Sequence, residues 1–340
     1  MRSATAIALL LVTGCTLGAP SAAKPAPAPR PELAVDDLRD NAIGPAAAEP
    51  PWLDLLRHTS ISGSGKATHP GPSRDGARVV YATTEFGLRP QIALRETDGV
   101  APVRLTTEAD NLFPRISPDG QRFAWAANRE GKGFDIYVAR LDAPFAVSRL
   151  TQEEGDDIAP SWSPDGKRIV YSHGRADGVW QLVIVDVGTR LKTYLGPGLY
   201  PDWSPDPKAG LIAFQSQPKE AGGRSGVWVV GTDGRRPREV VGDKTGIWSA
   251  VQPRFSPDGR WIAYATVNKS TESRVFGAPD QADDVWIIRP DGTYDTRLTD
   301  DLSAESWPAW GGNRVFFVST RELRAPNVWS VQVKPLEDAQ

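Results

Sequence analysis

Short stretches of apolar and small residues recur along most of the chain, separated by polar loops that contain glycine. Residues 121–126 are mainly apolar or small, which suits a sheet, and residues 135–140 show the alternation of a strand. The polar loop 128–133 lies between them, and residues 147–151 follow as a short outer strand. This pattern predicts short antiparallel strands joined by turns and loops.

A fixed phrase, Pro-x-aromatic-Ser-Pro-Asp-Gly, precedes the second strand of each unit. Its clearest copies span residues 114–120, 160–166, 201–206 and 253–259, and two degenerate copies span 70–76 and 308–313. Asp-Gly is a hairpin turn, because glycine tolerates positive φ and aspartate hydrogen-bonds to its own backbone. We therefore interpret the aspartates of this phrase as turn residues and not as catalytic groups.

Self-similarity at a period of roughly 40–50 residues indicates a repeat architecture. Four short antiparallel strands in each of six units predict an all-β fold, a six-bladed β-propeller. The last unit lacks its own fourth strand, and residues 56–61 resemble an isolated outer strand. We expect this N-terminal strand to close the last blade, which would remove an exposed sheet edge.

The amino terminus has the layout of a signal peptide. Residues 1–3 include an arginine, residues 4–12 are apolar, and Cys15 follows small residues. This segment resembles the bacterial lipobox, which implies a lipoprotein signal peptide over residues 1–15 and a lipid on Cys15. Thr16 follows in place of the aspartate that marks inner-membrane retention, which favours the outer membrane, on the periplasmic side of the envelope.

Residues 16–52 are predicted to form an Ala/Pro-rich tether and a short N-terminal segment, with brief helices near 33–41 and 52–56. The propeller is expected over residues 53–336. A propeller of this length forms one large domain, and we expect it to be a monomer.

Composition excludes several function classes. The net charge is −3 and no basic stripe is evident, which argues against nucleic acid as a partner. The chain has three histidines, His58, His69 and His173, far apart in sequence, so we expect no metal and no cofactor. Cys15 is the single cysteine, and neither a Gly-x-Ser-x-Gly motif nor a Walker loop is present.

The repeats resemble those of TolB-type propellers, from about residue 69 to residue 333. TolB is the periplasmic propeller of the Tol–Pal system, and the same repeat occurs in oligogalacturonate lyases and in the propellers of prolyl-oligopeptidase-like enzymes. Residues 16–60 are too few for the separate α/β domain of TolB. The resemblance implies a TolB-like propeller that acts in the envelope.

Propellers bind ligands where the loops that enter the innermost strands converge. Several of these loops are acidic, and together they would form a negative funnel at the channel mouth. The candidate binding residues in these loops are Asp110, Asn111, Asp156, Asp157, Trp248, Ser249, Glu305 and Trp307. Such a funnel would attract a cationic protein or peptide partner, with the tryptophans as anchors.

The sequence leaves more than one function open. The leading hypothesis is a non-enzymatic envelope lipoprotein that binds a protein or peptide partner, in a complex similar to Tol–Pal. The alternative is a polysaccharide lyase, a glycoside hydrolase or a glycan-binding module that acts at the central channel. A glycosidase would need two carboxylates at a set distance, which a sequence does not reveal.

Overall fold

A computed structural model of the protein describes residues 52–59, 65–99, 101–218, 223–242, 248–268, 282–300, 303–321 and 325–333. The predicted signal peptide with Cys15, most of the tether and the helix near 33–41 lie outside the described residues. No helix in the described part of the chain is long and apolar enough to cross a membrane.

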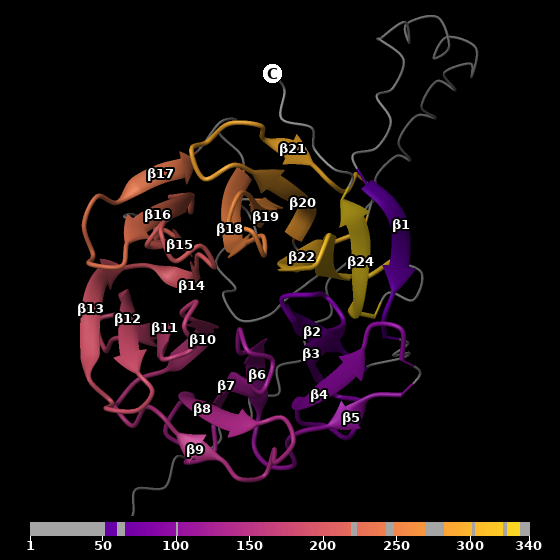
Figure 1. The fold of residues 1–340 in the computed structure, drawn as a ribbon, viewed down its shortest axis with the longest axis vertical. Helices are drawn as coiled ribbons and strands as arrows, with labels where there is room; N and C mark the ends of the chain where they lie inside the picture. Colours follow the sequence, from indigo (N-terminus) through magenta and orange to yellow (C-terminus); the bar gives the residue numbers. More distant parts are fainter. Residues whose placement is uncertain are drawn as a thin grey trace, which may run out of the picture. The chain divides into compact units, whose positions relative to one another are not determined.

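Six four-stranded antiparallel sheets surround a central axis, as the sequence predicts (Figure 1). The innermost strands are β2 (Ala67–Pro72), β6 (Asn111–Ile116), β10 (Asp157–Trp162), β14 (Leu199–Trp203), β18 (Trp248–Phe255) and β22 (Glu305–Gly311). The second strands are β3 (Arg78–Thr83), β7 (Arg122–Ala127), β11 (Arg168–Gly174), β15 (Leu211–Gln215), β19 (Ile262–Asn268) and β23 (Arg314–Ser319).

The third strands are β4 (Gln91–Glu96), β8 (Asp135–Arg140), β12 (Trp180–Asp186), β16 (Val227–Gly231), β20 (Ala282–Ile288) and β24 (Asn327–Val333). The outer strands are β5 (Val103–Arg104), β9 (Ser148–Arg149), β13 (Lys192–Pro197), β17 (Arg238–Val241), β21 (Thr296–Arg297) and β1 (Trp52–Arg57). Blades 1 to 5 each take four consecutive strands from β2 onward, and blade 6 has the order β1-β24-β23-β22.

The N-terminal strand closes the ring, as predicted, although its bounds differ from the predicted ones. It lies at Trp52–Arg57, slightly earlier than residues 56–61, and pairs antiparallel with β24. The backbone amide of His58 continues this pairing by donating to the Val328 carbonyl at 2.8 Å. The helix expected near 52–56 is wrong, because the open edge of β24 supplies backbone partners that a single helical turn could not replace.

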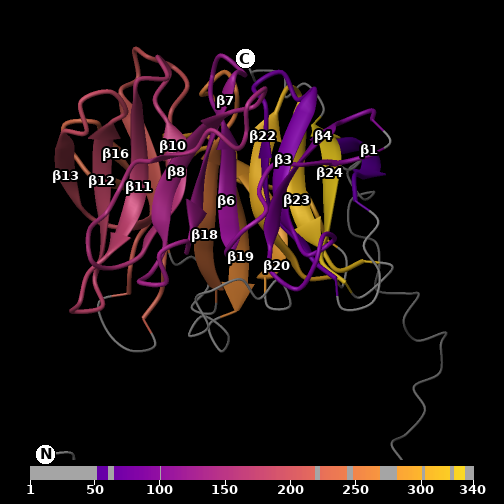
Figure 2. The same cartoon turned by 90° about the horizontal axis from the view of Figure 1, so that it is seen from below.

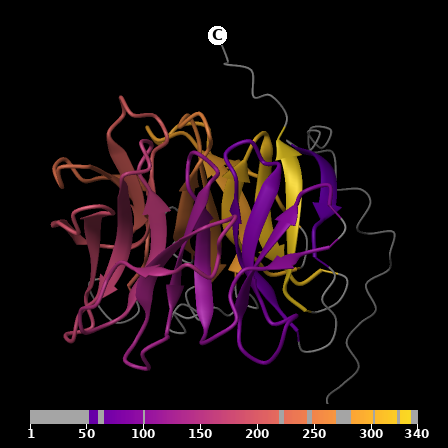
Figure 3. The same ribbon diagram turned by 60° about the horizontal axis from the view of Figure 1, so that its bottom comes forward.

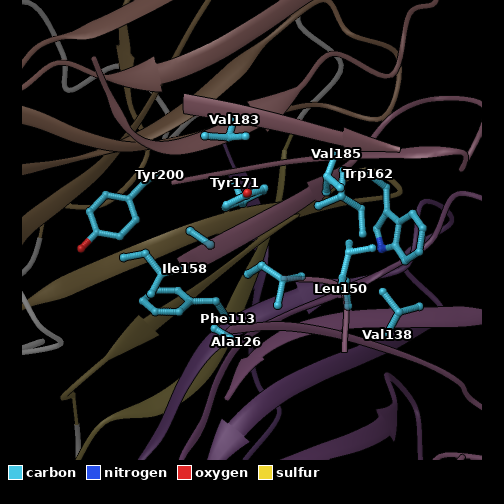
Figure 4. Packing of buried hydrophobic residues seen from close by; sticks show 14 of the residues in the cluster. Phe113, Ala126, Val138, Leu150, Ile158, Trp162, Tyr171, Val183, Val185 and Tyr200 are labelled. Carbon is cyan, nitrogen blue, oxygen red and sulfur yellow. The ribbon is translucent and has the colours of Figure 1, made fainter. Parts of the chain in front are cut away.

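The blades stand side by side around the axis, as the two views from the side show (Figures 2 and 3). Apolar side chains fill the space between neighbouring sheets. In Figure 4, Val138 and Leu150 of blade 2 lie close to Trp162 of blade 3, all three from one buried cluster. Because each sheet is covered on both faces, its strands contain nearly continuous buried residues.

Arginines at the start of second strands connect neighbouring blades. Arg78 donates to the Gly120 carbonyl at 2.9 Å, and Arg122 donates to the Gly166 carbonyl at 2.8 Å. The guanidinium of Arg122 also lies over the ring of Trp162, 4.8 Å from its centroid. In blades 2 and 3, the repeated phrase therefore supplies both a hairpin turn and a contact for the arginine of the preceding blade.

Candidate functional site

Every innermost strand contains a β-bulge at the first proline of its repeat. Six residues, each directly before such a proline, have φ between 49° and 57°: His69, Phe113, Ala159, Tyr200, Gln252 and Trp307. The register of each innermost strand with its second strand shifts at this point. Proline fits there because it has no N–H group to offer to the ladder, and an unpaired bulge residue needs none.

Four of these six residues are aromatic, and their rings meet on the axis. The centroid of His69 lies 4.2 Å from that of Phe113 and 4.3 Å from that of Trp307. Tyr200 completes the group, 5.2 Å from Trp307. All four are at most 5% exposed. We call these four residues the axial plug, because they fill the middle of the channel.

One end of the axis carries the Ser-Pro-Asp-Gly turns, and we call it the turn end. The turns confirm the structural role predicted for their aspartates. In blade 2, the Ser117 hydroxyl donates to Asp119 Oδ1 at 2.5 Å, and the same oxygen accepts the backbone amide of Gln121 at 3.0 Å. Blades 1, 3 and 5 repeat the serine–aspartate contact.

A cavity of about 130 Å³ opens on the axis at the turn end, lined by residues from all six blades. The residues that follow the bulge prolines form a ring around it: Gly71, Arg115, Ser161, Asp202, Arg254 and Ala309. Arg115 belongs to blade 2 and Arg254 to blade 5, so the two arginines come from opposite sides of the ring. We call this cavity the arginine pocket.

Neutral oxygens hold both ring arginines. Arg115 Nη1 donates to the carbonyl oxygens of Pro70 and Pro114 at 2.8 and 2.9 Å. Arg254 is 4% exposed, and its Nη1 donates to the carbonyl of Pro253 at 2.8 Å and to that of Tyr200 at 3.2 Å. These contacts orient the guanidinium groups without neutralising them.

Burial shifts the acid–base behaviour of the ring. It lowers the pKa of Arg115, and repulsion from Arg254 lowers that pKa further. Burial also lowers the pKa of Arg254, against the attraction of Asp202. The pKa of Asp202 is raised, again mainly by burial. The ordinary pKa of arginine is so high that its guanidinium group stays protonated in proteins, so the pocket is a site of costly positive charge.

The opposite end of the axis, which we call the loop end, holds the residues predicted from the sequence. Most of these side chains are buried in contacts within the fold. Asn111 is fully buried and accepts the indole N–H of Trp125 at 2.9 Å. Asp157 is 1% exposed and contacts His173, and Glu305 is 1% exposed and forms an ion pair with Arg321.

The other predicted residues are divided between surface, core and plug. Asp110 and Asp156 are half-buried, and Asp156 Oδ1 accepts the amide of Phe134 at 2.8 Å. Ser249 is fully buried, and Trp307 belongs to the axial plug. Trp248 begins β18, and its side chain is outside the described residues. As a binding surface, the eight residues remain a prediction.

Comparison with known proteins agrees with the geometry. Residues 59–194, which cover blades 1 and 2 and most of blade 3, match the family described as the TolB beta propeller domain. Among solved structures, a putative TolB from Agrobacterium tumefaciens has a TM-score of 0.59 at 20% identity, covering 83% of this chain and 97% of that one. The protein contains a TolB-like β-propeller.

Other solved structures share the fold of this TolB-like propeller. TolB from Acinetobacter baumannii has a TM-score of 0.58 at 22% identity and covers 73% of this chain, which spans 58% of that protein. An oligogalacturonate lyase in complex with manganese has a TM-score of 0.56 at 13% identity, covering 85% of this chain and 95% of that one. No curated protein matches the sequence. Identities this low establish the fold alone.

Among the described residues, one group of side chains has the composition of a metal site. Ligand atoms of Glu153, Asp157 and His173 lie within 4.8 Å of one another. Lys192 forms an ion pair with Glu153, and the contact with Asp157 raises the pKa of His173. The lysine and the histidine thus already balance the two carboxylates. This group could not be predicted from the sequence, because strand pairing of Asp157 with His173 brings it together.

Sequence reasoning also missed the arginine pocket. The signal was present, since a proline inside an innermost strand indicates a bulge, and the residue after each proline occupies an equivalent place in every blade. Comparing these positions alone would have placed Arg115, Asp202 and Arg254 on one ring. The predicted funnel drew attention to the loop end instead.

Proposed function

We propose that this protein is a non-enzymatic binding module of the bacterial cell envelope, which captures a protein or peptide partner on the propeller axis at the turn end. The arginine pocket carries this proposal. It lies on the axis, takes residues from all six blades, and holds two arginines that donate to neutral carbonyls, with Asp202 as the one acidic lining residue. Concave sites with a few convergent polar groups are the usual binding sites of proteins.

The envelope location belongs to the same proposal. It is supported by the charged and apolar segments that precede Cys15 and by the Ala/Pro-rich stretch after it. A lipid on Cys15 would hold the propeller at a membrane surface, and the tether would let it reach a partner. Metabolic labelling with a fatty acid should mark the wild-type protein and not Cys15→Ser.

The enzymatic alternative has weaker support from the pocket. Glycoside hydrolases use two carboxyl groups on either side of the bond that they cleave. Asp202 is the one carboxylate among the residues that line the arginine pocket. Both of its oxygens accept hydrogen bonds, from Ser161 Oγ at 2.9 Å and from the Phe255 amide at 2.8 Å. This arrangement favours binding over proton transfer.

Photo-crosslinking from each end of the axis tests the proposal. Benzoylphenylalanine would replace Pro164, at the rim of the arginine pocket, or Leu88, a fully exposed residue of the loop end, in the full-length protein within its own envelope. We expect one discrete crosslinked partner from position 164 and none from position 88. A partner captured from position 88 alone would contradict the proposal and return the site to the predicted funnel.

A further inference from the structure

The arginine pocket contains more positive than negative side chains. Three arginines line it, Arg74, Arg115 and Arg254, and Asp202 is the one acidic residue among the lining side chains. Arg74 reaches across the rim from blade 1, where its Nη2 donates to the Pro257 carbonyl of blade 5 at 2.9 Å. The remaining lining residues are uncharged, so the cavity favours a negatively charged occupant.

Asp202 attracts both arginines, but its hydrogen bonds go elsewhere. Its Oδ1 accepts the Ser161 hydroxyl, and its Oδ2 accepts the Phe255 amide. The contacts of Arg115 and Arg254 go to backbone carbonyls. Buried charges in proteins are normally paired, because an unpaired charge in a low dielectric is costly. Buried Arg254 and half-buried Arg115 make their hydrogen bonds to neutral oxygens, and the single charge of Asp202 balances at most one of them.

The ring keeps space for an occupant. Blade 1 contributes Gly71, where a Cβ atom would collide with the Pro114 carbonyl and lie 3.2 Å from Arg115 Nη1. Ser161 and Ala309 are also small, so the two long side chains do not fill the cavity. A volume of about 130 Å³ accommodates several water molecules or the end of one acidic side chain.

We propose that the arginine pocket binds a carboxylate group of a peptide partner, held between Arg115 and Arg254. Guanidinium groups bind carboxylates through paired, charge-assisted hydrogen bonds. The rim favours a peptide as the source, since the partly exposed residues Trp310, Pro118 and Pro164 line the same cavity and offer apolar surface to residues beside the carboxylate. The inference rests on the function proposed above and adds the chemistry of the ligand.

Short blocked peptides distinguish the possible sources of the carboxylate. One tripeptide has a central glutamate with both ends blocked, a second has alanines with a free carboxyl terminus, and a third has glutamine with both ends blocked. Inorganic phosphate is the fourth probe. Binding to the full-length protein is measured by ligand-observed saturation-transfer NMR at two salt concentrations, since charge pairing weakens with salt.

The variants are Arg115→Gln and Arg254→Gln, with Arg115→Lys and Arg254→Lys as versions that keep the charge. Arg168→Gln is the matched control, because Arg168 lies over Trp203 outside the pocket and its loss removes the same charge from the same end. Circular dichroism confirms that each variant is folded before binding is measured.

We expect at least one carboxylate peptide to bind, and its dissociation constant to rise about ten-fold or more in each glutamine variant. The lysine variants should lose less affinity for the peptide, and Arg168→Gln should bind the peptide as the wild type does. Equal binding of the glutamine peptide, binding of phosphate alone, or equal weakening by Arg168→Gln would overturn the inference. If crosslinking from position 164 persists in Arg254→Gln, the carboxylate inference fails while the proposed function stands.

Discussion

The two ends of the propeller axis differ in how their charged side chains are paired. At the loop end, Asp157 contacts His173 and Glu305 pairs with Arg321, so each buried acid has a partner from the neighbouring strand. At the turn end, half-buried Arg115 and buried Arg254 donate to neutral carbonyls, and one acidic residue, Asp202, lies near both. Paired charges maintain a fold, whereas charges that the fold leaves unpaired are available to a ligand. This difference, and not the number of acidic loops, indicates which end binds.

The axial plug separates the two ends and should have the greatest influence on stability. Trp307→Ala removes a side chain that contacts His69, Phe113 and Tyr200 and leaves a cavity on the axis. We expect the free energy of unfolding to fall by about 3–5 kcal/mol, measured by chemical denaturation. Leu88→Ala, at an exposed site, should change it by less than about 0.5 kcal/mol. Equal losses in the two variants would show that the plug does not support the fold.

The buried acids of the loop end are expected to stabilise the fold without contributing to binding. Asp157→Ala leaves His173 without its carboxylate and should lower the free energy of unfolding by roughly 1–3 kcal/mol. Asp110→Ala is the control. Because Asp110 is half-buried, this substitution should lower the free energy of unfolding by under about 0.5 kcal/mol. Crosslinking from position 164 should survive in the folded Asp157→Ala protein. Its loss there would restore a binding role to the loop end.

The plug should make stability depend on pH. Burial lowers the pKa of His69 from 6.5 to about 3, and Arg115 and Arg254 lower it too. Below pH 6.5, His69 therefore becomes protonated in the unfolded chain but stays neutral in the folded protein. The free energy of unfolding falls as the pH drops. The loss should reach about 2 kcal/mol at pH 5.

His69→Phe isolates this effect, because it keeps an aromatic ring in the plug and cannot titrate. His58, whose pKa burial lowers to about 4, contributes equally to both proteins. The gap in unfolding free energy between wild type and variant should change in favour of the variant from pH 7 to pH 5. If the difference in unfolding free energy stays constant over that range, folding does not lower the pKa of His69.

The arginines of the turn end are expected to add little to stability. Arg254→Met removes a buried charge whose desolvation is costly and keeps most of the apolar stem. We expect the free energy of unfolding to change by less than about 1 kcal/mol, or to rise. A loss of several kcal/mol would show that Arg254 serves the fold, as Asp157 does at the other end.

The sequence repeat made the fold predictable, and the local chemistry of turns predicted the role of individual residues. Asp119 and its equivalents could be assigned as turn residues because Asp-Gly has that geometry wherever it occurs. The missing fourth strand of the last repeat predicts an N-terminal closing strand, but not its bounds. Residues 52–56 belong to this strand and not to a helix, because their partner, β24, lies more than 270 positions away in the sequence and leaves no local signal there.

The candidate site depends on strand pairing and on the bulge at each repeat proline, which a sequence shows only indirectly. Asp157 and Glu305 were predicted to face the channel mouth, but strand pairing placed their side chains against His173 and Arg321. The bulge at each repeat proline turns the preceding residue to the axis, where His69 and Trp307 meet. Which positions reach the axis is therefore a property of the assembled ring, and no single repeat reveals it.

The central claim is that the axis binds at the turn end, between two arginines. A crystal structure of the protein soaked with the blocked glutamate tripeptide tests this most directly, because it locates the carboxylate. The account predicts density for a carboxylate within hydrogen-bond distance of both Arg115 and Arg254. Density for the peptide at the loop end, or an arginine pocket that holds only water at saturating peptide, would contradict it.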